Sequence, residues 1–494
     1  MPSMRLTILH LITFFSFFTS SFAQTAYAND FVDPDYILAK TYGNHTYLAR
    51  TTAVSWAKTL AAKGPWSVIN KAATPPSGDK HDFMSWAPYW WPDCSNAGNT
   101  TALTPEQIWV TCTYVNKDGQ FNPDVRLVNN VGDFQDFAEA SFYNAIAWAM
   151  DVDDKATFEA NVVKFISAWF LDPATAMNPN LNFAQMQRGP TGQVGSRTGV
   201  LDLKAMAKVA SAVLLLRKGK STAWTADIDN QFIEWSRKYI TWLENSDLAI
   251  KERESKNNHG SFYYNQLAAM KLIVNDAAGA KAATDDYFKG IYLDQISATG
   301  EQPLEAARTR PYHYRAYNLA AMITNARLAK YADPSSTVWN TTTTAGATIK
   351  TALDFAMTLP ASTSGETSYT EELYPDVAAV ASVYGDPDGK YLAFLKKGDP
   401  KFIAQPYIVW NQPFAEQETG GLPPTNTGKG NSGPSTPKPK SGSNSSADAT
   451  SDAISHVSSS WIITFITCAL ALAVGISGAH APEPIIHAEA FIMA

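Results

Sequence analysis

The chain has 494 residues, of which 45% are hydrophobic and 12% aromatic, a size that permits one large domain or as many as three. Its formal net charge is -7, and no cluster of Lys and Arg large enough to bind a phosphate backbone is present, so the composition argues against a nucleic-acid-binding protein. A polyanionic ligand is not excluded, because a few cationic and amide side chains in a cleft can bind carboxylates locally.

Both ends of the chain resemble targeting segments. Residues 1–23 are typical of a secretory signal peptide, with Arg5 before the apolar run LTILHLITFFSFF and Ala23 at the cleavage site. Residues 419–460 form a low-complexity linker rich in Ser, Thr, Gly and Pro, and residues 461–494 begin with an apolar run. This order predicts a C-terminal lipid anchor of the glycosylphosphatidylinositol (GPI) type, with a single membrane span as the alternative. We therefore expect a secreted, extracellular protein attached to the cell surface or cell wall.

Cysteine usage agrees with export. Cys468 lies in the C-terminal tail, which leaves Cys94 and Cys112 as an even pair in the body, and we expect a disulfide between them in an oxidising compartment. Four Asn-x-Ser/Thr glycosylation sequences are also compatible with a secretory route. They lie at Asn44, Asn99, Asn340 and Asn444.

The body of the chain, residues 24–418, is predicted to be an all-α domain. Segments such as residues 133–153 and 199–219 place apolar residues at the i, i+3, i+4, i+7 spacing of a helix. Several of these segments are apolar on more than one face, as inner helices are when outer helices cover them. Periodicity alone leaves an ordinary helical bundle and an (α/α) toroid both open.

Two polar, aromatic loops interrupt the helical pattern. The first, SGDKHDFMSWAPYWWPDC (77–94), contains His81, Tyr89 and Trp90, and the second, NFAQMQRGPTGQVGSRTG (182–199), contains Gln185 and Arg197. Long loops with many functional side chains on a helical frame are where binding sites tend to lie. We expect these five side chains to bind substrate.

The stretch KNNHGSFYYNQ (256–266) is the densest group of neutral hydrogen-bonding side chains. Asn257, Asn258 and His259 directly precede an aromatic helical segment that includes Tyr263, and two amides beside a histidine exceed what helix capping requires. Such a set is suited to binding an anionic group, and we place Asn257 and Tyr263 among the expected substrate contacts.

Several other chemistries lack sequence support. No HExxH or paired CxxC is present, so we expect no metal and no cofactor, and no G-x-S-x-G sequence indicates a serine hydrolase. A glycoside hydrolase needs two carboxylates across a cleft, which Glu305 with Asp82 or Asp202 could supply.

The stretch EQPLEAARTRPYHYRAYNL (301–319) adds cationic and phenolic groups. Arg308 lies one helical turn after Glu305, and we expect arginine to lower the pKa of a nearby tyrosine, because positive charge favours the phenolate. Asn, His, Arg and Tyr together suit β-elimination of a uronic-acid polymer, in which the substrate carboxylate must be neutralised before a base removes the C5 proton. For mannuronate or glucuronate the C5 proton and O4 leave from the same side, so one phenol can act as base and acid.

These blocks, together with YVNKDGQFNPDV (114–125) and SRTGVLDL (196–203), occur in order and resemble the alginate lyase-like superfamily of polysaccharide lyases, in its secreted fungal and bacterial branch. The resemblance implies an (α/α) toroid with a cleft across it. It also implies that Asn258 and His259 match the Asn-His pair of the family, Arg308 its active-site arginine and Tyr314 its catalytic tyrosine.

The resemblance departs from the family pattern at one spacing. Tyr314 follows Arg308 one residue sooner than the matching pair does in the best-known alginate lyases, so Tyr312 and Tyr317 remain alternatives for the catalytic tyrosine. Tyr89 is the residue we match to the lid tyrosine of the family.

We therefore expect a monomeric lyase that acts on an anionic β-1,4-linked uronan, either alginate-type polymannuronate or a glucuronan. Its only contact with a membrane would be the C-terminal anchor. A glycoside hydrolase on the same fold and an anchored carbohydrate-binding protein without catalysis are the alternatives.

Overall fold

A computed structural model describes residues 31–98, 103–150 and 152–411, which all belong to one compact unit. The expected signal peptide, linker and anchor segment lie outside the described residues, as do Asn99 and Asn444. Of the helices that are described, none is both long enough and apolar enough to cross a membrane.

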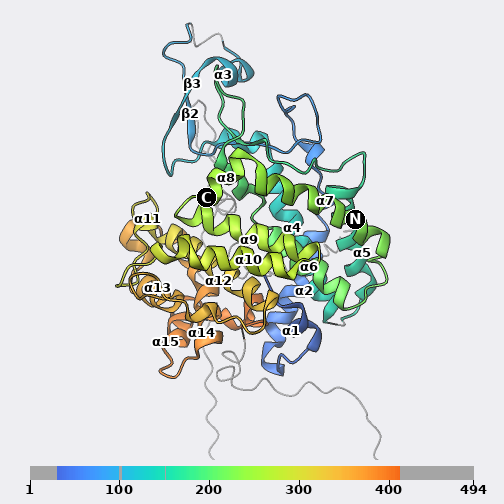
Figure 1. The fold of residues 1–494 in the computed structure, drawn as a ribbon, viewed down its shortest axis with the longest axis vertical. Coiled ribbons are helices and arrows are strands. Elements are labelled where there is room, and N and C mark those ends of the chain that lie inside the picture. The colour runs from blue at the N-terminus through green and yellow to red at the C-terminus, as the bar shows by residue number, and fades with distance from the viewer. Residues whose placement is uncertain (1–30, 99–102, 151, 412–494) are drawn as a thin grey trace, which may run out of the picture. The chain divides into compact units, whose positions relative to one another are not determined.

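The larger helices alternate along the chain between two kinds. One kind is buried on most of its surface and comprises α4 (Asn130–Ala149), α6 (Met206–Lys218), α9 (Asn258–Ile273), α12 (Pro311–Ala332) and α14 (Tyr374–Tyr384). The other kind follows each of these in turn, buries one face and comprises α5 (Lys155–Ile166), α7 (Ala226–Asn245), α10 (Ala277–Lys289), α13 (Ile349–Ala356) and α15 (Lys390–Gly398). This inner and outer alternation is the (α/α) toroid (Figure 1).

Residue type explains the two kinds of helix. In α7 the buried residues Phe232, Trp235, Tyr239 and Leu243 recur at helical spacing on one side, so the helix covers the core with one face. In α4 small alanines alternate with large aromatics, which allows helices on several sides to approach closely. Accordingly α4 packs against α5, α6 and α2 (Tyr47–Ala61), while α9 packs against α6, α10 and α12.

The first and last parts of the described chain pack together. The short helix α1 (Pro34–Ala39) contacts α6, and the 3-10 helices η11 (Phe402–Ala404) and η12 (Pro406–Ile408) return to α2. Between the large helices lie α8 (Asp247–Arg253) and α11 (Pro303–Ala306), which directly precede α9 and α12. Both short helices therefore lie beside the N-terminal ends of inner helices.

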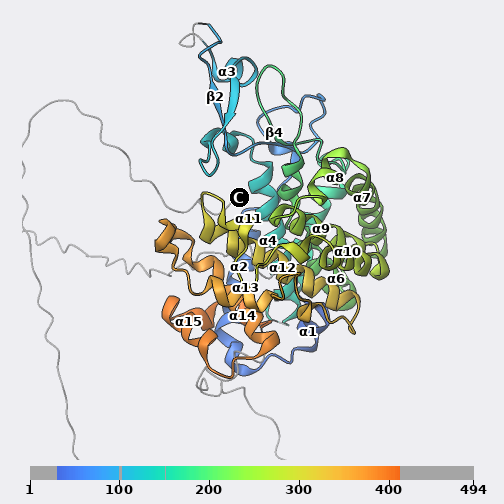
Figure 2. The same cartoon turned by 60° about the vertical axis from the view of Figure 1, so that its left-hand side comes forward.

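The two polar loops contain the strands. Strand β1 (Met84–Trp86) pairs in parallel with β4 (Phe183–Met186), and β2 (Trp90–Asp93) pairs antiparallel with β3 (Thr113–Asn116). With α3 (Pro105–Thr111), the β2–β3 pair projects from one end of the helical body (Figure 2). The expected disulfide is confirmed, because Cys94 and Cys112 are bonded across this projection.

One expected helix begins later than its pattern indicates. The segment 199–219 is helical in spacing throughout, but Arg197–Leu203 forms the 3-10 helix η6 and the α-helix begins only at Met206. A Cβ on Gly199 would lie 2.6 Å from the carbonyl oxygen of Ala184 in β4, so this glycine lets η6 pass close beside the strand. The close packing positions the start of η6, where Arg197 bonds to Glu252 of α8.

Candidate active site

The group of Asn257, Asn258 and His259 forms the start of α9. Asn257 is the N-cap residue but its side chain makes no capping hydrogen bond, so its partly exposed amide is not used by the helix. A Cβ on Gly260 would lie 2.1 Å from the carbonyl oxygen of Ser255, and glycine therefore allows α9 to begin tightly against the end of α8. This tight start fixes where the three polar side chains point.

Asn258 points inward, to Glu305 of α11. Its backbone N–H and its Nδ2 donate to the two carboxylate oxygens of Glu305, each at 2.7 Å, and both side chains are buried. Its Oδ1 has no hydrogen-bond partner among the described residues. Burial raises the pKa of Glu305, although the two hydrogen bonds from Asn258 lower it. Asn258 therefore joins the start of α9 to α11 through Glu305, and in this structure its amide is buried.

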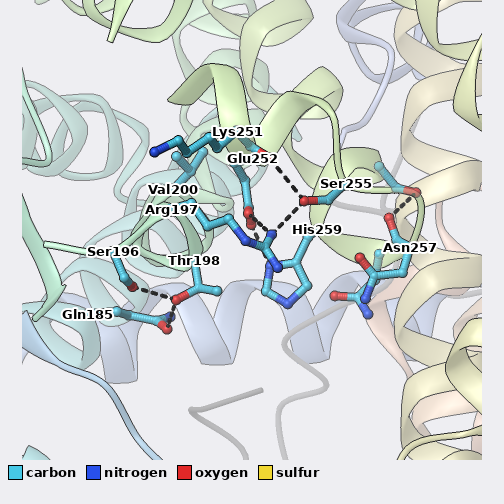
Figure 3. A network of polar contacts seen from close by, with 12 residues as sticks. Gln185, Ser196, Arg197, Thr198, Val200, Lys251, Glu252, Ser255, Asn257 and His259 are labelled. Atoms are coloured by element: carbon cyan, nitrogen blue, oxygen red, sulfur yellow. Dashed lines mark hydrogen bonds and ion pairs between the residues drawn. The ribbon is translucent and has the colours of Figure 1, made fainter. Parts of the chain in front are cut away.

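His259 points to a different carboxylate, Glu252 of α8. The Nδ1 of His259 lies 2.5 Å from Oε1 of Glu252, and the other carboxylate oxygen accepts from Nη1 of Arg197 at 2.7 Å (Figure 3). The side chain of Glu252 is fully buried, whereas that of His259 is 14% exposed and that of Arg197 is 43% exposed. Arg197, which we expected to bind substrate, therefore lies beside His259 with much of its side chain open to solvent.

Tyr314 lies in the first turn of α12 and contacts Arg308. Nη2 of Arg308 donates to the hydroxyl oxygen of Tyr314 at 2.8 Å, and the guanidinium lies 3.8 Å from the centre of the Tyr314 ring. The same nitrogen donates to Asp118 at 2.9 Å, and Asp118 lies just after β3. Burial raises the pKa of Asp118, but the hydrogen bond and charge of Arg308 outweigh it and hold that pKa below the ordinary value.

The site has two halves, one around His259 and one around Tyr314, and Tyr89 belongs to the second. Its hydroxyl oxygen lies 3.1 Å from that of Tyr314 and accepts from Nη2 of Arg310 at 2.5 Å. Nη1 of Arg310 donates to the hydroxyl of Tyr369 at 2.5 Å, and Tyr369 belongs to the 3-10 helix η10 (Thr367–Leu373). Two phenols are thus in contact, and each has its own guanidinium.

The expected lowering of a tyrosine pKa is wrong for the resting site. Burial raises the pKa of Tyr314 well above the ordinary value, and the nearby phenol of Tyr89 adds to this. Arg308 and Arg310 lower the pKa, but their effect is smaller than that of burial. The arginines are visible in the sequence, but the burial of the Tyr314 hydroxyl, which outweighs them, depends on the fold.

The two alternative tyrosines occupy the protein interior. Tyr312 is buried and its hydroxyl donates to the backbone oxygen of Thr370 at 2.9 Å. Tyr317 is also buried and packs on Phe262, with ring centres 4.4 Å apart. Of the three tyrosines, Tyr314 is the one whose hydroxyl contacts Arg308.

The other residues expected to bind substrate are spread over three environments. His81 and Trp90 are partly exposed, and the His81 ring bonds to the backbone oxygen of Ala176 through Nδ1. Gln185 is buried, has a positive φ of 41° and bonds to Asp202 and Thr198. Tyr263 is fully buried and donates to the backbone oxygen of Leu243. The structure therefore does not bring Tyr263 to the site, and it makes Gln185 part of the support behind Arg197.

The carboxylates considered for a hydrolase are buried and bonded within the protein. Asp202 accepts from Ser85 and Gln185, and burial raises its pKa to about 6. Asp82 accepts from Ser77, Asn178 and Asn180, and Glu305 accepts twice from Asn258. A general acid or nucleophile must reach the glycosidic bond, and none of these three carboxyl groups is presented to solvent. Within the described ranges, no three His, Cys, Asp or Glu side chains gather in a way that could hold a metal ion.

Four residues of the site were not expected from the sequence. They are Glu252, Asp118, Arg310 and Tyr369. The first three contact the expected residues His259, Arg308 and Tyr89, and Tyr369 contacts Arg310. Local signals existed for two of them, because Glu252 lies seven residues before His259 and Arg310 lies between Arg308 and Tyr314. Asp118 lies in the segment YVNKDGQFNPDV (114–125), but nothing in that segment indicates Arg308 as its partner.

A family model described as "Alginate lyase" matches residues 67–366, more than half of the chain. The chain belongs to the alginate lyase family. The match includes every residue of both halves of the site except Tyr369, which follows three residues after it.

A solved structure agrees with this family. The crystal structure of an alginate lyase from Bacteroides ovatus has a TM-score of 0.67 and 26% sequence identity, over 79% of this chain and 100% of that chain. Alginate lyase A1-III from Sphingomonas species A1 has a TM-score of 0.41 and 15% identity, over 74% of this chain and 92% of that chain. No curated protein matches the sequence significantly. The family and the first of these structures identify the protein as a polysaccharide lyase with the (α/α) toroid fold.

Proposed function

We propose that the protein cleaves a β-1,4-linked uronic-acid polymer, polymannuronate or glucuronan, by β-elimination, with Tyr314 as base and acid. The observation that carries this proposal is the bond from Arg308 to the hydroxyl of Tyr314 at 2.8 Å. A phenol in contact with a guanidinium can release and regain its proton within one catalytic cycle, because the cation stabilises the phenolate.

Two residues near Glu305, His259 and Arg308, can neutralise the substrate carboxylate. Glu305 accepts two hydrogen bonds from Asn258, which adjoins His259, and it lies three residues before Arg308, so both of these residues are near it in the chain or through that contact. We assign the binding of the carboxylate to His259 and Arg308, with the partly exposed amide of Asn257 beside them. Asn258 contributes by holding Glu305, which fixes the start of α9 against α11. Donors fixed in this way stabilise the negative charge that develops when the C5 proton leaves.

Both proton transfers of the elimination can then be made by one side chain, that of Tyr314. The Tyr314 phenolate takes the C5 proton, the C4–O4 bond breaks with formation of the C4=C5 double bond, and the Tyr314 phenol returns its proton to O4. In mannuronate and glucuronate both events occur on the same side of the ring, which suits a single phenol.

We also infer that the protein is secreted and attached to the cell surface, through residues 1–23 and the segment 461–494. Two of the glycosylation sequences lie among the described residues, at Asn44 and Asn340, and both asparagines are exposed. Their exposure and the Cys94–Cys112 disulfide support a route through an oxidising compartment.

The test is to incubate the purified protein separately with polymannuronate, glucuronan and polyguluronate and to follow the ultraviolet absorbance of the new double bond. A rise with polymannuronate or glucuronan is expected and names the substrate. New reducing ends without the absorbance would show hydrolysis instead. Absence of both, on all three polymers, would favour a carbohydrate-binding protein without catalysis.

A further inference from the structure

Glu252 lies between two cationic or potentially cationic groups at the open side of the site. It belongs to α8, and its carboxylate is fully buried. One oxygen binds Nδ1 of His259 at 2.5 Å and the other binds Nη1 of Arg197 at 2.7 Å. A buried carboxylate with both oxygens occupied has little freedom to move, so it holds the imidazole in one orientation.

This contact determines which ring nitrogen carries the proton. A carboxylate accepts hydrogen bonds, so Nδ1 of His259 must be the donor and must carry a hydrogen. In the neutral ring, Nε2 is then without a proton. Figure 3 shows this nitrogen at the end of the ring that points away from Glu252, and the side chain of His259 is 14% exposed. The nitrogen available to a substrate is therefore a proton acceptor in the neutral ring.

A substrate carboxylate can be bound only by a donor. For the uronate carboxylate proposed above, Nε2 of His259 becomes a donor when the ring takes up a second proton. We propose that Glu252 is a positioning residue for the reaction, which holds His259 in its Nδ1–H form and thereby makes binding of the substrate carboxylate depend on uptake of one proton by the ring. The proton comes from solvent when substrate binds and returns to solvent when product leaves. This inference takes its substrate from the proposed function. The prediction that Nδ1 of His259 carries the hydrogen does not depend on that function.

The charges that act on the ring come from three elements. Glu252 lies on α8, Arg197 on η6 and Glu305 on α11, and the charge of His259 acts on Glu305. Lys251, although adjacent to Glu252 in sequence, points away from the ring (Figure 3). Of these groups, Glu252 and Glu305 are acidic and Arg197 is basic.

The first experiment is ¹⁵N NMR of the protein labelled at histidine, with the His259 signals assigned by comparison with His259→Gln. The neutral ring should be of the Nδ1–H form in the wild type. In Glu252→Gln the single amide oxygen bonds to Arg197, because a guanidinium requires an acceptor, and the amide N–H then faces Nδ1. The ring should change to the Nε2–H form. A neutral Nε2–H ring in the wild type overturns the proposal, whether or not any uronan is cleaved.

The second experiment measures KM against pH with the polymer that is cleaved. In the wild type, KM should rise about tenfold per pH unit once the doubly protonated ring is lost. In Glu252→Gln this dependence should disappear, because a neutral Nε2–H donates at every pH. A merely structural role for Glu252 would change kcat or stability and leave the slope in place, and that result would overturn the proposal.

The matched control is Glu244→Gln. Glu244 lies on α7 and binds Lys271 on α9 at 2.7 Å, so this variant also removes a carboxylate that bonds to the α9 helix, but far from His259. Its KM should depend on pH as in the wild type. Should Glu252→Gln fail to fold, the wild-type spectrum and the wild-type slope of KM decide the question. Absence of cleavage on every uronan would refute the proposed function alone, and the NMR result would still decide the role of Glu252 in holding the ring.

Discussion

The hydroxyl oxygens of Tyr89 and Tyr314 lie 3.1 Å apart, although 225 residues separate them in the chain. Tyr89 directly precedes β2 in the projecting strand pair, whereas Tyr314 belongs to an inner helix of the toroid. Their contact shows that the projection is packed onto the first turn of α12, and Asp118 makes a second contact with Arg308, which lies between α11 and α12. The enclosure of Tyr314, and hence its reactivity, depends on both parts of the fold.

Removal of the Tyr314 hydroxyl is the most direct test of its role. We expect Tyr314→Phe to lower kcat at least about 10³-fold, because a single group serves both proton transfers. The ring remains, so the stacking of Arg308 on it and the melting temperature should change little. Kinetics by absorbance of the unsaturated product and thermal unfolding of the same samples measure both quantities.

The matched control is Tyr312→Phe in the same helical turn. It loses one hydrogen bond to a backbone oxygen, which corresponds to about 1 kcal/mol of unfolding free energy. Its kcat should stay within about twofold of the wild type, since the Tyr312 hydroxyl does not contact Arg308. If Tyr312→Phe were inactive and Tyr314→Phe active, the assignment of the catalytic tyrosine would be reversed.

The raised pKa of Tyr314 predicts how turnover depends on pH. Because burial raises this pKa, the phenolate is scarce at neutral pH and its population grows as pH rises. We therefore expect kcat at saturating polymer to increase steadily from about pH 6 to about pH 9. Arg308→Gln removes a cation that lowers this pKa, so its profile should move to higher pH. A wild-type kcat that falls over this range would show that another group controls turnover.

Much of the fold was readable in the sequence because helical periodicity is a local property. The segment 133–153 predicts α4, which begins three residues earlier, at Asn130, and ends four residues earlier, at Ala149, since its apolar positions repeat at helical spacing. Periodicity did not distinguish η6 from the start of α6, because Val200, Leu201 and Leu203 are buried in either kind of helix. The toroid itself came from the family resemblance, since amphipathic helices alone also form bundles.

The sequence indicated which types of residue form the site, but it did not indicate which of them are in contact. Asn257, Asn258 and His259 are adjacent in sequence, but only the fold decides that the second is enclosed by Glu305 while its neighbours are partly exposed. The partner Asp118 was missed because an ion pair between segments 190 residues apart has no local signal. Glu252 lies seven residues before His259, but only the fold shows that its carboxylate bonds to the imidazole. The sequence thus indicated the groups that carry the chemistry more completely than the groups that orient them.

The disulfide is expected to support activity through the projection. Cys94 follows β2 and Cys112 precedes β3, so the bond closes the far end of the strand pair whose near end bears Tyr89 and Asp118. Replacing both cysteines with serine should lower the free energy of unfolding of this region by about 3 kcal/mol, from the entropy of the opened loop. kcat/KM should fall as well, because Tyr89 and Asp118 are then less firmly held at Tyr314 and Arg308. Hydrogen exchange of 84–120 and kinetics of the double variant measure both effects, and unchanged kcat/KM would separate the projection from catalysis.

Asp202 predicts a pH dependence of stability that is independent of catalysis. Burial raises its pKa from 3.8 to about 6, so the folded protein binds a proton that the unfolded chain has already released between those values. The stability that this proton provides is complete below pH 3.8 and is lost as pH rises through about 6, a change of about 3 kcal/mol at about 1.4 kcal/mol per unit. Asp202→Asn should lack this loss in denaturant titrations at about pH 4 and about pH 7.

Ser85→Ala is the control, because it removes a hydrogen bond that lowers the pKa of Asp202 but keeps the carboxyl group. This variant should extend the loss of stability to higher pH. Equal pH dependence in the wild type and Asp202→Asn would mean that Asp202 stays ionised in its buried position.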